Sequence, residues 1–451
     1  MTTQSLATTG RPSPLGRAMA MAGDRPGAAP ATGRRHVVGL CCRNCGRPQE
    51  LGPSYVCPAC FGPLEVVYDY GVARETLTRD ALAGRPAGIW RYLELLPVAA
   101  APARGLAVGG TPLVAAGRLA DDLGLERLWL KDDTRNPTLS FKDRVVAMAA
   151  ARALEFGFDT LACASTGNLA GATAAAAARL GLRAFVFVPA DVEPAKIDHA
   201  LAYGATVVPV EGSYDQINRL SLEIAEDHGW AFVNINLRPY YAEGSKTLAF
   251  EVAEQLGWRL PDAVVAPIAS GSLFTKIAKG FRELVEVGLV APRPVRFVGA
   301  QAEGCAPVAS AFATGAERIT PVREPRTLVK SLAIGDPADG RYAVELARGT
   351  GGSIEAVPDV RTAAAIGRLA ALEGIFAETA AGATLGALEQ ALARGVIRPD
   401  EEVVALLTGN GVKTPEARAH GLEPQEGAPD RAGLARPIRP TLTAFDAWYG
   451  A

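Results

Sequence analysis

Short apolar runs and longer amphipathic stretches alternate along the chain from about Thr111 onward. The apolar runs predict strands at 125–131, 160–166, 183–189, 205–211, 231–236, 262–268, 295–301 and 401–409. Helical patterns, such as those at 141–157 and 359–374, separate these runs. Strand and helix in turn predict an α/β fold, in which parallel sheets are covered by helices on both faces.

Three predicted strands end in glycine-rich segments that carry polar side chains. They are ACASTGNLAGA at 162–172, APIASGSLFTKI at 266–277 and VVALLTGNGVKTP at 403–415. In open parallel sheets, ligands bind where the carboxyl ends of strands meet helix N-termini, because the backbone N–H groups there bind anions. Each segment alone is also consistent with an ordinary capped turn, so the indication of a site comes from their combination.

The composition narrows the classes of partner and compartment. A formal net charge of -2 over 451 residues gives no general electrostatic reason to bind nucleic acid or an anionic membrane. The longest apolar runs, such as 171–181, are interrupted well short of a membrane span. The segment 1–36 is rich in Pro, Gly, Ala and Thr and has no apolar region like that of a secretion signal. We interpret it as a flexible extension of a cytoplasmic protein.

The cysteines cluster near the N-terminus, five of the seven within 41–60. Four of them form two C-x2-C pairs, each followed closely by glycine: Cys42 with Cys45, and Cys57 with Cys60. Such pairs predict a zinc ribbon at 37–70, in which four thiolates bind one tetrahedral Zn²⁺. Because four thiolates leave no open coordination position, this zinc would be structural. Cys41 is an alternative to Cys42 as a ligand, and knuckles without metal are the alternative to the whole site.

Lys142 stands in LKDDTRNPTLSFKDRVV, 130–146, where charged and small polar residues give way to an apolar helix. The N-terminus of a helix is the less favourable end for a cation, and a lysine held there suits a nucleophile that forms an imine. The ordinary alternative is a solvated lysine paired with Asp143 or Asp133.

Taken together and in this order, the segments resemble the fold-type-II pyridoxal-phosphate enzymes, and among them the threonine synthase family. The resemblance covers most of 37–415, from the cysteine pairs through GGTPL, NPTLSFKDR, ASTGN, RPYYAEGSKT, IASGSL, KSLAIGDPADG, GIFAETAAG and LLTGNGVK. It implies two open, mainly parallel sheets. On this basis we expect a large cofactor-binding domain at 71–150 and 240–415, a small α/β domain at 151–239, and a tail at 416–451 that packs on the body.

The resemblance also implies roles for individual residues. Lys142 would be the catalytic residue and form a Schiff base with pyridoxal 5'-phosphate, Asn168 would hydrogen-bond the phenolic oxygen of the ring, and Thr408 would face the ring nitrogen. A hydroxyl at that place would leave the nitrogen largely unprotonated and so restrain side reactions. The cofactor phosphate would lie in the turn Ala269, Ser270, Gly271, Ser272 and Leu273. This turn departs from the glycine- and asparagine-rich form common in the fold.

The implied reaction converts O-phospho-L-homoserine and water to L-threonine and phosphate, by γ-elimination and then addition of water at Cβ. Hydroxyl and cationic residues in the matching segments are candidates to bind this small phosphorylated amino acid: Thr111, Ser140, Ser165, Thr166, Arg238, Lys246 and Lys330. Each of them has a solvated or capping role as its alternative. We also expect a homodimer.

Other functions stay open at this point. Cysteate synthase, which acts on O-phosphoserine with sulfite, resembles the same family closely, and threonine or serine dehydratases share the lysine and cofactor segments. The zinc ribbon and KSLAIGDPADG favour threonine synthase over the dehydratases but discriminate poorly against cysteate synthase. The near-neutral charge argues against a zinc-ribbon protein that binds nucleic acid.

Overall fold

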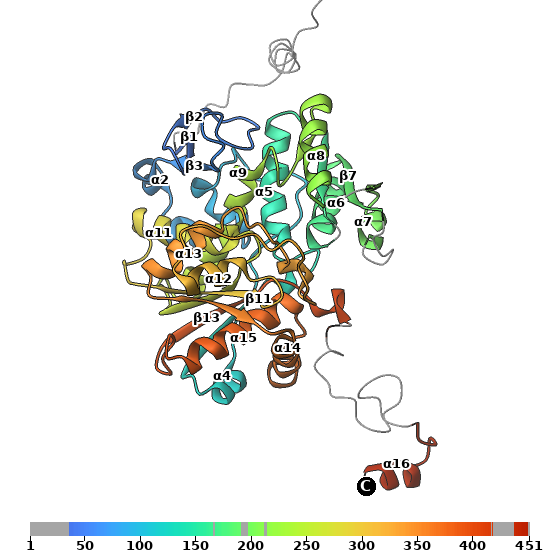
Figure 1. Cartoon of the computed structure of the whole chain (residues 1–451). Coiled ribbons are helices and arrows are strands. Elements are labelled where there is room, and N and C mark those ends of the chain that lie inside the picture. The colour runs from blue at the N-terminus through green and yellow to red at the C-terminus, as the bar shows by residue number, and fades with distance from the viewer. Residues whose placement is uncertain are drawn as a thin grey trace, which may run out of the picture.

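The computed structural model describes residues 36–165, 167–190, 197–211, 214–415, 417 and 437–449 (Figure 1). Within these residues the strands form three sheets, of three, six and four strands. The two larger sheets are mainly parallel, and helices flank them, so the predicted fold class is confirmed. The predicted extension lies outside the described residues except for His36.

The small sheet near the N-terminus is antiparallel, with the strand order β2-β1-β3. Its strands are β1 (Val37–Cys42), β2 (Pro48–Gln49) and β3 (Leu64–Tyr68). Along β3, Leu64, Val66 and Tyr68 are buried in alternation, as the two-residue period of a strand requires. On β1 the same alternation buries Cys42 and leaves Cys41 half-buried. This sheet is followed by α2 (Tyr70–Thr76), α3 (Arg79–Ala83) and η1 (Ile89–Leu95).

The six-stranded sheet has the order β12-β11-β10-β13-β5-β4 and is parallel except for the pair β4 and β5. Its strands are β4 (Leu113–Ala115), β5 (Arg127–Asp132), β10 (Ala263–Pro267), β11 (Arg296–Ala302), β12 (Ser353–Val357) and β13 (Glu402–Leu407). Every residue of β10 and β13 is buried. These strands are continuous apolar runs because helices cover both faces of the sheet.

Two apolar cores lie on the opposite faces of this sheet. Val264 and Val404 belong to one core, and their neighbours Val265 and Ala405 belong to the other. The helices around the sheet are α4 (Gly117–Leu123), α10 (Thr247–Gln255), α11 (Ser272–Glu286), α12 (Pro307–Thr314), α13 (Gly340–Gly349), α14 (Asp359–Glu373) and α15 (Thr379–Ala393). In Figure 1, α11, α12 and α13 lie on one side of the sheet and α14 and α15 on the other.

The four-stranded sheet is parallel throughout and has the order β8-β7-β6-β9. Its strands are β6 (Thr160–Ala164), β7 (Arg183–Pro189), β8 (Thr206–Val210) and β9 (Ala231–Phe232). Its neighbours along the chain are α5 (Lys142–Glu155), α6 (Asn168–Leu180), α7 (Asp198–Ala202), α8 (Tyr214–His228) and α9 (Arg238–Glu243). The strands of the two large sheets fall within the two domain ranges expected from the sequence, and the exact domain boundaries stay a prediction.

Short 3-10 turns and one further helix complete the described chain. They are η2 (Asp133–Arg135), η4 (Gly244–Lys246), η5 (Lys330–Leu332), η6 (Gly411–Lys413) and α16 (Leu442–Tyr449). No residue of α16 is buried, so the expected packing of the tail on the body is not observed there. Most of 416–451 lies outside the described residues. Among the described helices, none has both the length and the apolar character needed to cross a membrane.

Candidate active site

Three chain segments meet at the carboxyl edge of the six-stranded sheet. They are the residues before α5, the residues after β13 and the residues before α15. Backbone hydrogen bonds join them, from Phe141 to Thr408 (2.8 Å), from Asn410 to Leu139 (3.0 Å), from Glu378 to Gly409 (2.9 Å) and from Gly411 to Phe376 (3.0 Å). The start of α5 and the start of α15 are thereby held on either side of the segment TGNG.

The two glycines of TGNG are needed because the neighbouring segments approach very closely. A Cβ atom on Gly409 would lie 2.3 Å from the carboxyl carbon of Glu378, and one on Gly411 would lie 2.6 Å from the ring of Phe376. Any larger residue would push these segments apart. The glycines therefore position Glu378 beside Thr408.

Lys142 is the first residue of α5 and is half-buried. The rings of Phe141 and Tyr241 lie 5.2 Å and 5.9 Å from its Nζ. Within the described residues, this amine makes no hydrogen bond or ion pair, although its charge reaches the buried carboxyl of Glu378. An amine without a committed partner is available to react.

A polar network near Lys142 joins Asn168 at the start of α6, Glu378 just before α15, Thr408 after β13 and Lys413 on η6. Asn168 donates from Nδ2 to Glu378 (2.8 Å) and accepts at Oδ1 from Lys413 (2.8 Å), and Thr408 Oγ1 lies 3.5 Å from Glu378 Oε1. Burial raises the pKa of Glu378, against the hydrogen bond from Asn168 and the charges of Lys413 and Lys142. Burial also lowers the pKa of Lys413. Burial therefore acts against the charged form of each group, while their charged and polar neighbours act in its favour.

The sequence left open a pairing of Lys142 with Asp143 or Asp133, and the structure shows neither pair. Asp143 accepts hydrogen bonds from the backbone N–H (2.7 Å) and the hydroxyl (2.8 Å) of Thr138, and burial raises its pKa to about 6. Asp133 pairs with Arg144 at 2.7 Å. The two carboxylates next to Lys142 in the sequence thus stabilise the surrounding loop and leave the amine free.

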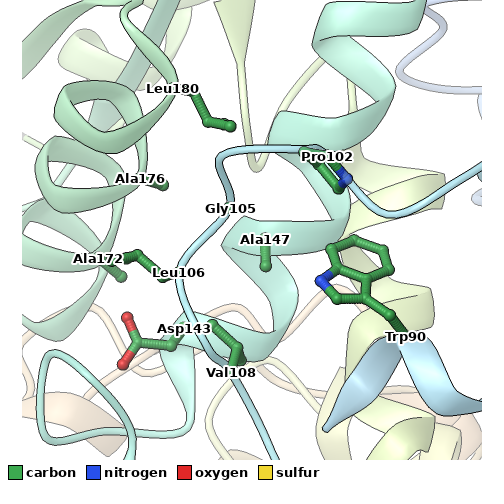
Figure 2. Close-up of a pocket in the computed structure, with 10 residues that line it drawn as sticks. All are labelled: Trp90, Pro102, Gly105, Leu106, Val108, Asp143, Ala147, Ala172, Ala176 and Leu180. Atoms are coloured by element: carbon green, nitrogen blue, oxygen red, sulfur yellow. The ribbon is translucent and has the colours of Figure 1, made fainter. Parts of the chain in front are cut away.

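Asp143 also lines a small pocket between α5 and α6 (Figure 2). The other lining residues are apolar or small: Trp90, Pro102, Gly105, Leu106, Val108, Ala147, Ala172, Ala176 and Leu180. The alanines of α5 and α6 face this space and allow the two helices to pack closely. The apolar residues that line this pocket are neighbours of Asp143 and contribute to its burial.

The predicted phosphate turn connects β10 to α11. Gly271 has φ +91°, a conformation that favours glycine, and Ser272 is the first residue of the 15-residue helix. A Cβ on Gly271 would lie 2.8 Å from the backbone of Asp339, whose N–H donates to Ser270 O at 2.8 Å. Since β10, β13 and β5 are parallel neighbours, this turn, Thr408 and the loop before Lys142 follow the same edge of the sheet.

The four paired cysteines of the N-terminal sheet also come together. Their sulfur atoms all lie within 4.8 Å of one another, with Cys42 Sγ 3.4 Å from Cys60 Sγ and Cys45 Sγ 3.7 Å from Cys57 Sγ. Zn–S bonds of about 2.3 Å in a tetrahedral site place sulfurs about 3.8 Å apart, so the spacing fits zinc. Cys41 Sγ instead lies 3.3 Å from Gly46 O.

The pKa values of these thiols shift in different directions, because the pKa of Cys60 is raised, against a backbone hydrogen bond from Gly62, by its contacts with Cys42 and Cys45, whereas that of Cys57 is lowered by a backbone hydrogen bond from Ala59. Burial raises the pKa of the Cys42 thiol, but hydrogen bonds from the backbone of Cys45 and Asn44 outweigh it, and the pKa falls to about 7. Thiolates are the form that binds zinc. The cluster of four sulfur atoms includes Cys42 and does not include Cys41.

Comparisons with known proteins agree with this geometry. The family model described as pyridoxal-phosphate-dependent enzyme matches residues 105–409. Threonine synthase of Methanocaldococcus jannaschii is 35% identical to this chain over 384 residues, which cover 85% of this chain and 94% of the relative. Threonine synthase of Methanosarcina acetivorans is 37% identical over 84% of this chain and 92% of its own. The chain belongs to the threonine synthase family of pyridoxal-phosphate-dependent enzymes.

Solved structures show the same fold. Threonine deaminase isoform 2 from Solanum lycopersicum matches with a TM-score of 0.58 at 22% identity, over 69% of this chain and 82% of that chain. Maize serine racemase matches with a TM-score of 0.57 at 20% identity, over 68% and 89%. At these identities the likeness concerns the fold. The predicted family and fold class are confirmed, and so is the dependence on pyridoxal phosphate.

Within this threonine synthase family fold, two predicted substrate residues lie in buried polar networks whose hydrogen bonds and ion pairs do not include Lys142. The Thr111 hydroxyl donates to Asp133 (2.7 Å) and accepts from Arg144 (2.9 Å). Lys246 is fully buried and pairs with Glu243 at 2.5 Å. Both side chains already have polar partners in the core, so the structure does not bring them to the site.

The other predicted substrate residues have varied surroundings. Ser140 precedes Phe141 and is fully buried, and its Oγ has no hydrogen-bond partner among the described residues. Ser165 follows β6 and accepts a hydrogen bond from Gly167 N at 3.3 Å. Arg238 pairs with Asp339 at 3.0 Å, and Lys330 is exposed. Thr166 lies outside the described residues. Ser140 and Ser165 are thus the candidates that adjoin Lys142 and Asn168 along the chain.

Sequence reasoning assigned no role to Glu378 or Lys413, which the structure places against Asn168. Both lie in segments that carried the family resemblance, GIFAETAAG and LLTGNGVK. Glu378 precedes an alanine-rich segment, and this segment predicts a buried helix. Because a carboxylate is rarely buried unless it has a polar or charged partner, this position was a usable signal. Tyr241, whose ring lies near Lys142, gave no comparable signal.

Proposed function

We propose that this chain converts O-phospho-L-homoserine and water to L-threonine and phosphate, with Lys142 as the catalytic residue. The single observation that supports this most is the uncommitted amine of Lys142, whose charge acts on the buried carboxyl of Glu378, the partner of Asn168 and Thr408. The threonine synthases among its relatives, similar over most of their length, support the choice of reaction.

The residues at the sheet edge fit pyridoxal phosphate. Asn168 uses one Nδ2 hydrogen for Glu378 and keeps a second for the phenolic oxygen of the ring. The buried hydroxyl of Ser140 has no partner among the described residues and is available to the ligand. The turn 269–273 offers backbone N–H groups at the N-terminus of α11 to the phosphate.

When bound, pyridoxal phosphate supplies an electron sink for the negative charge that develops beside the substrate's amino group. Lys142 would hold the cofactor, and its amine, when not so engaged, would move protons at Cα and Cβ of the substrate. The half-buried position of Lys142 between Phe141 and Tyr241 limits the access of water to this amine. Phosphate would leave from Cγ, Cγ would gain a proton and become the methyl group, and water would add its hydroxyl at Cβ while Cα regains a proton.

Thr408 and Glu378 set the polarity at the ring nitrogen in this proposal. Thr408 offers a hydroxyl, and the nearby carboxyl of Glu378 has a raised pKa because of its burial. A hydroxyl beside a carboxyl whose pKa is raised would be a weaker anionic partner for the ring nitrogen than an exposed carboxylate. This would restrain the electron sink, in agreement with the restricted chemistry proposed for the site.

We also propose that Cys42, Cys45, Cys57 and Cys60 bind a structural Zn²⁺. Sulfur spacings of 3.4 and 3.7 Å between paired thiols support this site. With four thiolates there is no coordination position for a substrate, so the metal takes no part in the reaction. A cytoplasmic homodimer that binds a small phosphorylated amino acid stays our prediction from the sequence.

The test is a comparison of two substrates. Phosphate release from O-phospho-L-homoserine is expected to exceed release from O-phospho-L-serine, and threonine is expected as the amino-acid product. Borohydride reduction of the yellow holoenzyme should leave the cofactor attached to Lys142. Phosphate release without threonine, or a preference for O-phosphoserine with sulfite, would overturn the substrate assignment, and a protein that stays colourless with the cofactor would overturn the function.

A further inference from the structure

The first cysteine pair is connected to the body of the protein by the two residues between its cysteines. Arg43 directly follows Cys42, and its Nη1 donates to Asp339 Oδ1 at 3.0 Å. Asn44 accepts a hydrogen bond from the hydroxyl of Tyr342. Asp339 is the residue before α13, and Tyr342 lies in its first turn. The metal knuckle therefore contacts the N-terminus of α13 through both of these residues.

Asp339 connects this contact to the phosphate turn. Its second carboxylate oxygen accepts from Arg238 at 3.0 Å, and its backbone N–H donates to Ser270 O at 2.8 Å. The closeness of its backbone to Gly271 leaves no room for a side chain there. One aspartate thus joins the knuckle and the turn that we assign to the cofactor phosphate.

The Arg43 guanidinium is held in one orientation. It stacks on the ring of Tyr342, 3.5 Å from the ring centroid, and its Nε lies 3.6 Å from Glu65 on β3. The contacts with the ring of Tyr342 and with the carboxylates of Glu65 and Asp339 restrict the guanidinium to one orientation. The position of Asp339 therefore depends on where the knuckle presents Arg43.

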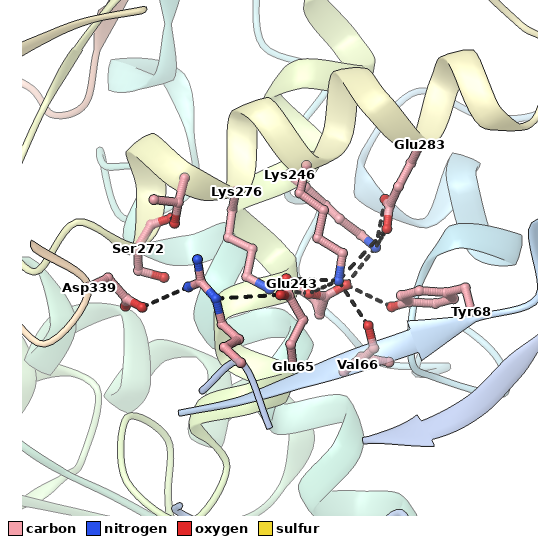
Figure 3. Close-up of polar contacts among 12 residues, drawn as sticks. Glu65, Val66, Tyr68, Glu243, Lys246, Ser272, Lys276, Glu283 and Asp339 are labelled. Atoms are coloured by element: carbon pink, nitrogen blue, oxygen red, sulfur yellow. Dashed lines mark hydrogen bonds and ion pairs between the residues drawn. The ribbon is translucent and has the colours of Figure 1, made fainter. Parts of the chain in front are cut away.

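The same small sheet also holds the helix that begins at the turn. On α11, Lys276 pairs with Glu65 at 2.6 Å, and Lys279 donates to Val66 O at 2.9 Å. In Figure 3, Ser272 and Asp339 lie at one end of this polar cluster, and Tyr68 and Glu283 lie at the other. Residues of β3 and the residue after Cys42 thus contact α11 and the segment packed against its first turn.

We propose that Arg43 and Asp339 are positioning residues for the cofactor phosphate, so that metal binding at the knuckle raises the affinity for pyridoxal phosphate. This inference rests on the proposed function. The metal fixes the loop between Cys42 and Cys45, the loop presents Arg43, and Arg43 neutralises and orients Asp339 beside the turn. Without Arg43, a less neutralised carboxylate lies next to the site of a phosphate dianion and repels it.

The test uses Arg43→Met in the full chain, with Arg47→Met as the matched control. Arg47 is an exposed arginine of the same knuckle and makes no ion pair among the described residues. Affinity is measured by absorbance titration of the cofactor-free protein with pyridoxal phosphate and with pyridoxal, which lacks the phosphate. Zinc content is measured in parallel.

Arg43→Met is expected to weaken pyridoxal phosphate binding on the order of tenfold, a typical coupling between sites. Pyridoxal affinity and zinc content should stay unchanged, and Arg43→Lys should recover part of the loss. Arg47→Met should match the wild type. An equal loss for both ligands would show a general structural effect and overturn the proposal, as would unchanged affinity for pyridoxal phosphate.

Metal removal provides the second arm. Chelation of zinc should weaken pyridoxal phosphate binding in the wild type and have little further effect in Arg43→Met, because the connection is already broken there. Equal effects of chelation in both proteins would overturn the inference while leaving the proposed function intact. If no variant and not even the wild type bound pyridoxal phosphate, the proposed function itself would fail.

Discussion

Lys142 and Lys246 both stand in polar segments that open helices, but their surroundings differ completely. Lys246 is fully buried and is bound by Glu243 at 2.5 Å and Glu283 at 2.9 Å, with the ring of Tyr68 4.0 Å from its Nζ. Lys142 is half-buried and has aromatic rings as its nearest described neighbours. A lysine whose charge is fully paired holds structure together, whereas an unpaired one at a sheet edge is available for chemistry.

The networks around the two lysines differ in charge balance as well. Around Lys246, three buried or half-buried carboxylates and three lysines pair with one another: Glu65, Glu243, Glu283, Lys246, Lys276 and Lys279. Near Lys142, burial raises the pKa of Glu378 and lowers that of Lys413, and the two groups form no direct ion pair among the described residues. The first arrangement gives stability and the second gives reactivity, and substitutions separate the two.

The largest expected effect follows from removal of the Lys142 amine. Lys142→Ala should lower phosphate release from O-phospho-L-homoserine on the order of 10³-fold or more, because the covalent attachment and the proton transfers both depend on this group. The thermal unfolding midpoint should stay close to that of the wild type, since the amine makes no ion pair among the described residues. Activity assays and calorimetry measure the two quantities.

Lys246→Met is the counterpart and should give the opposite pattern. Removal of the ammonium leaves Glu243 and Glu283 buried with one partner fewer, a change that costs about 3–5 kcal/mol of unfolding free energy in comparable buried pairs. The folded fraction should keep its KM. A raised KM at an unchanged unfolding midpoint would instead support the substrate role suggested by the sequence and contradict the comparison.

The strands that the sequence revealed carry continuous apolar runs, and they include β8 at an edge of the four-stranded sheet. β10 and β13 are continuous apolar runs because helices cover them. The strands β4 and β12 were missed for a physical reason, since both lie at edges of the six-stranded sheet. β12, SIEAV, carries a serine and a glutamate, and β4 has three residues. Short or polar edge strands leave little hydrophobic pattern to detect.

The site was predictable to the extent that it depends on strand ends. Thr408 lies near the end of one predicted strand and Lys142 opens the helix reached from a parallel neighbour, so their shared edge follows from parallel topology. Asn168 follows a strand of the other sheet, so its approach to Glu378 did not follow from that topology. The partners of Lys246 were not predictable, because Glu283 lies 37 residues away on another helix. The choice of Cys42 over Cys41 likewise needed the inward face of β1.

The next prediction examines the charge beside Lys142. Burial raises the pKa of Asp143 from 3.8 to about 6, so the folded protein holds a proton that the unfolded chain has lost between these values. Stability from this group is therefore present below about pH 4 and is lost as pH rises to about 6, by at most about 1.4 kcal/mol per pH unit. Asp143→Asn should lack this fall in thermal midpoint. Asp121→Asn, at an exposed position of α4, controls for the removal of a carboxylate.

Glu378→Gln should change the thermal stability least among these substitutions. It tests directly whether the site near Lys142 contains a charged pair like those around Lys246. Burial raises the pKa of Glu378 above its ordinary 4.5, so its contribution to stability is present below about pH 4.5 and is lost as pH rises toward the folded pKa. Glutamine imitates the neutral form, so the variant's thermal midpoint should match the wild type at pH 4.5 and below and exceed it at pH 8. Glu126→Gln at an exposed position is the control. A variant less stable than the wild type at pH 8 would show that Glu378 is a charged partner of Lys413, and the site would then be a paired cluster like that of Lys246.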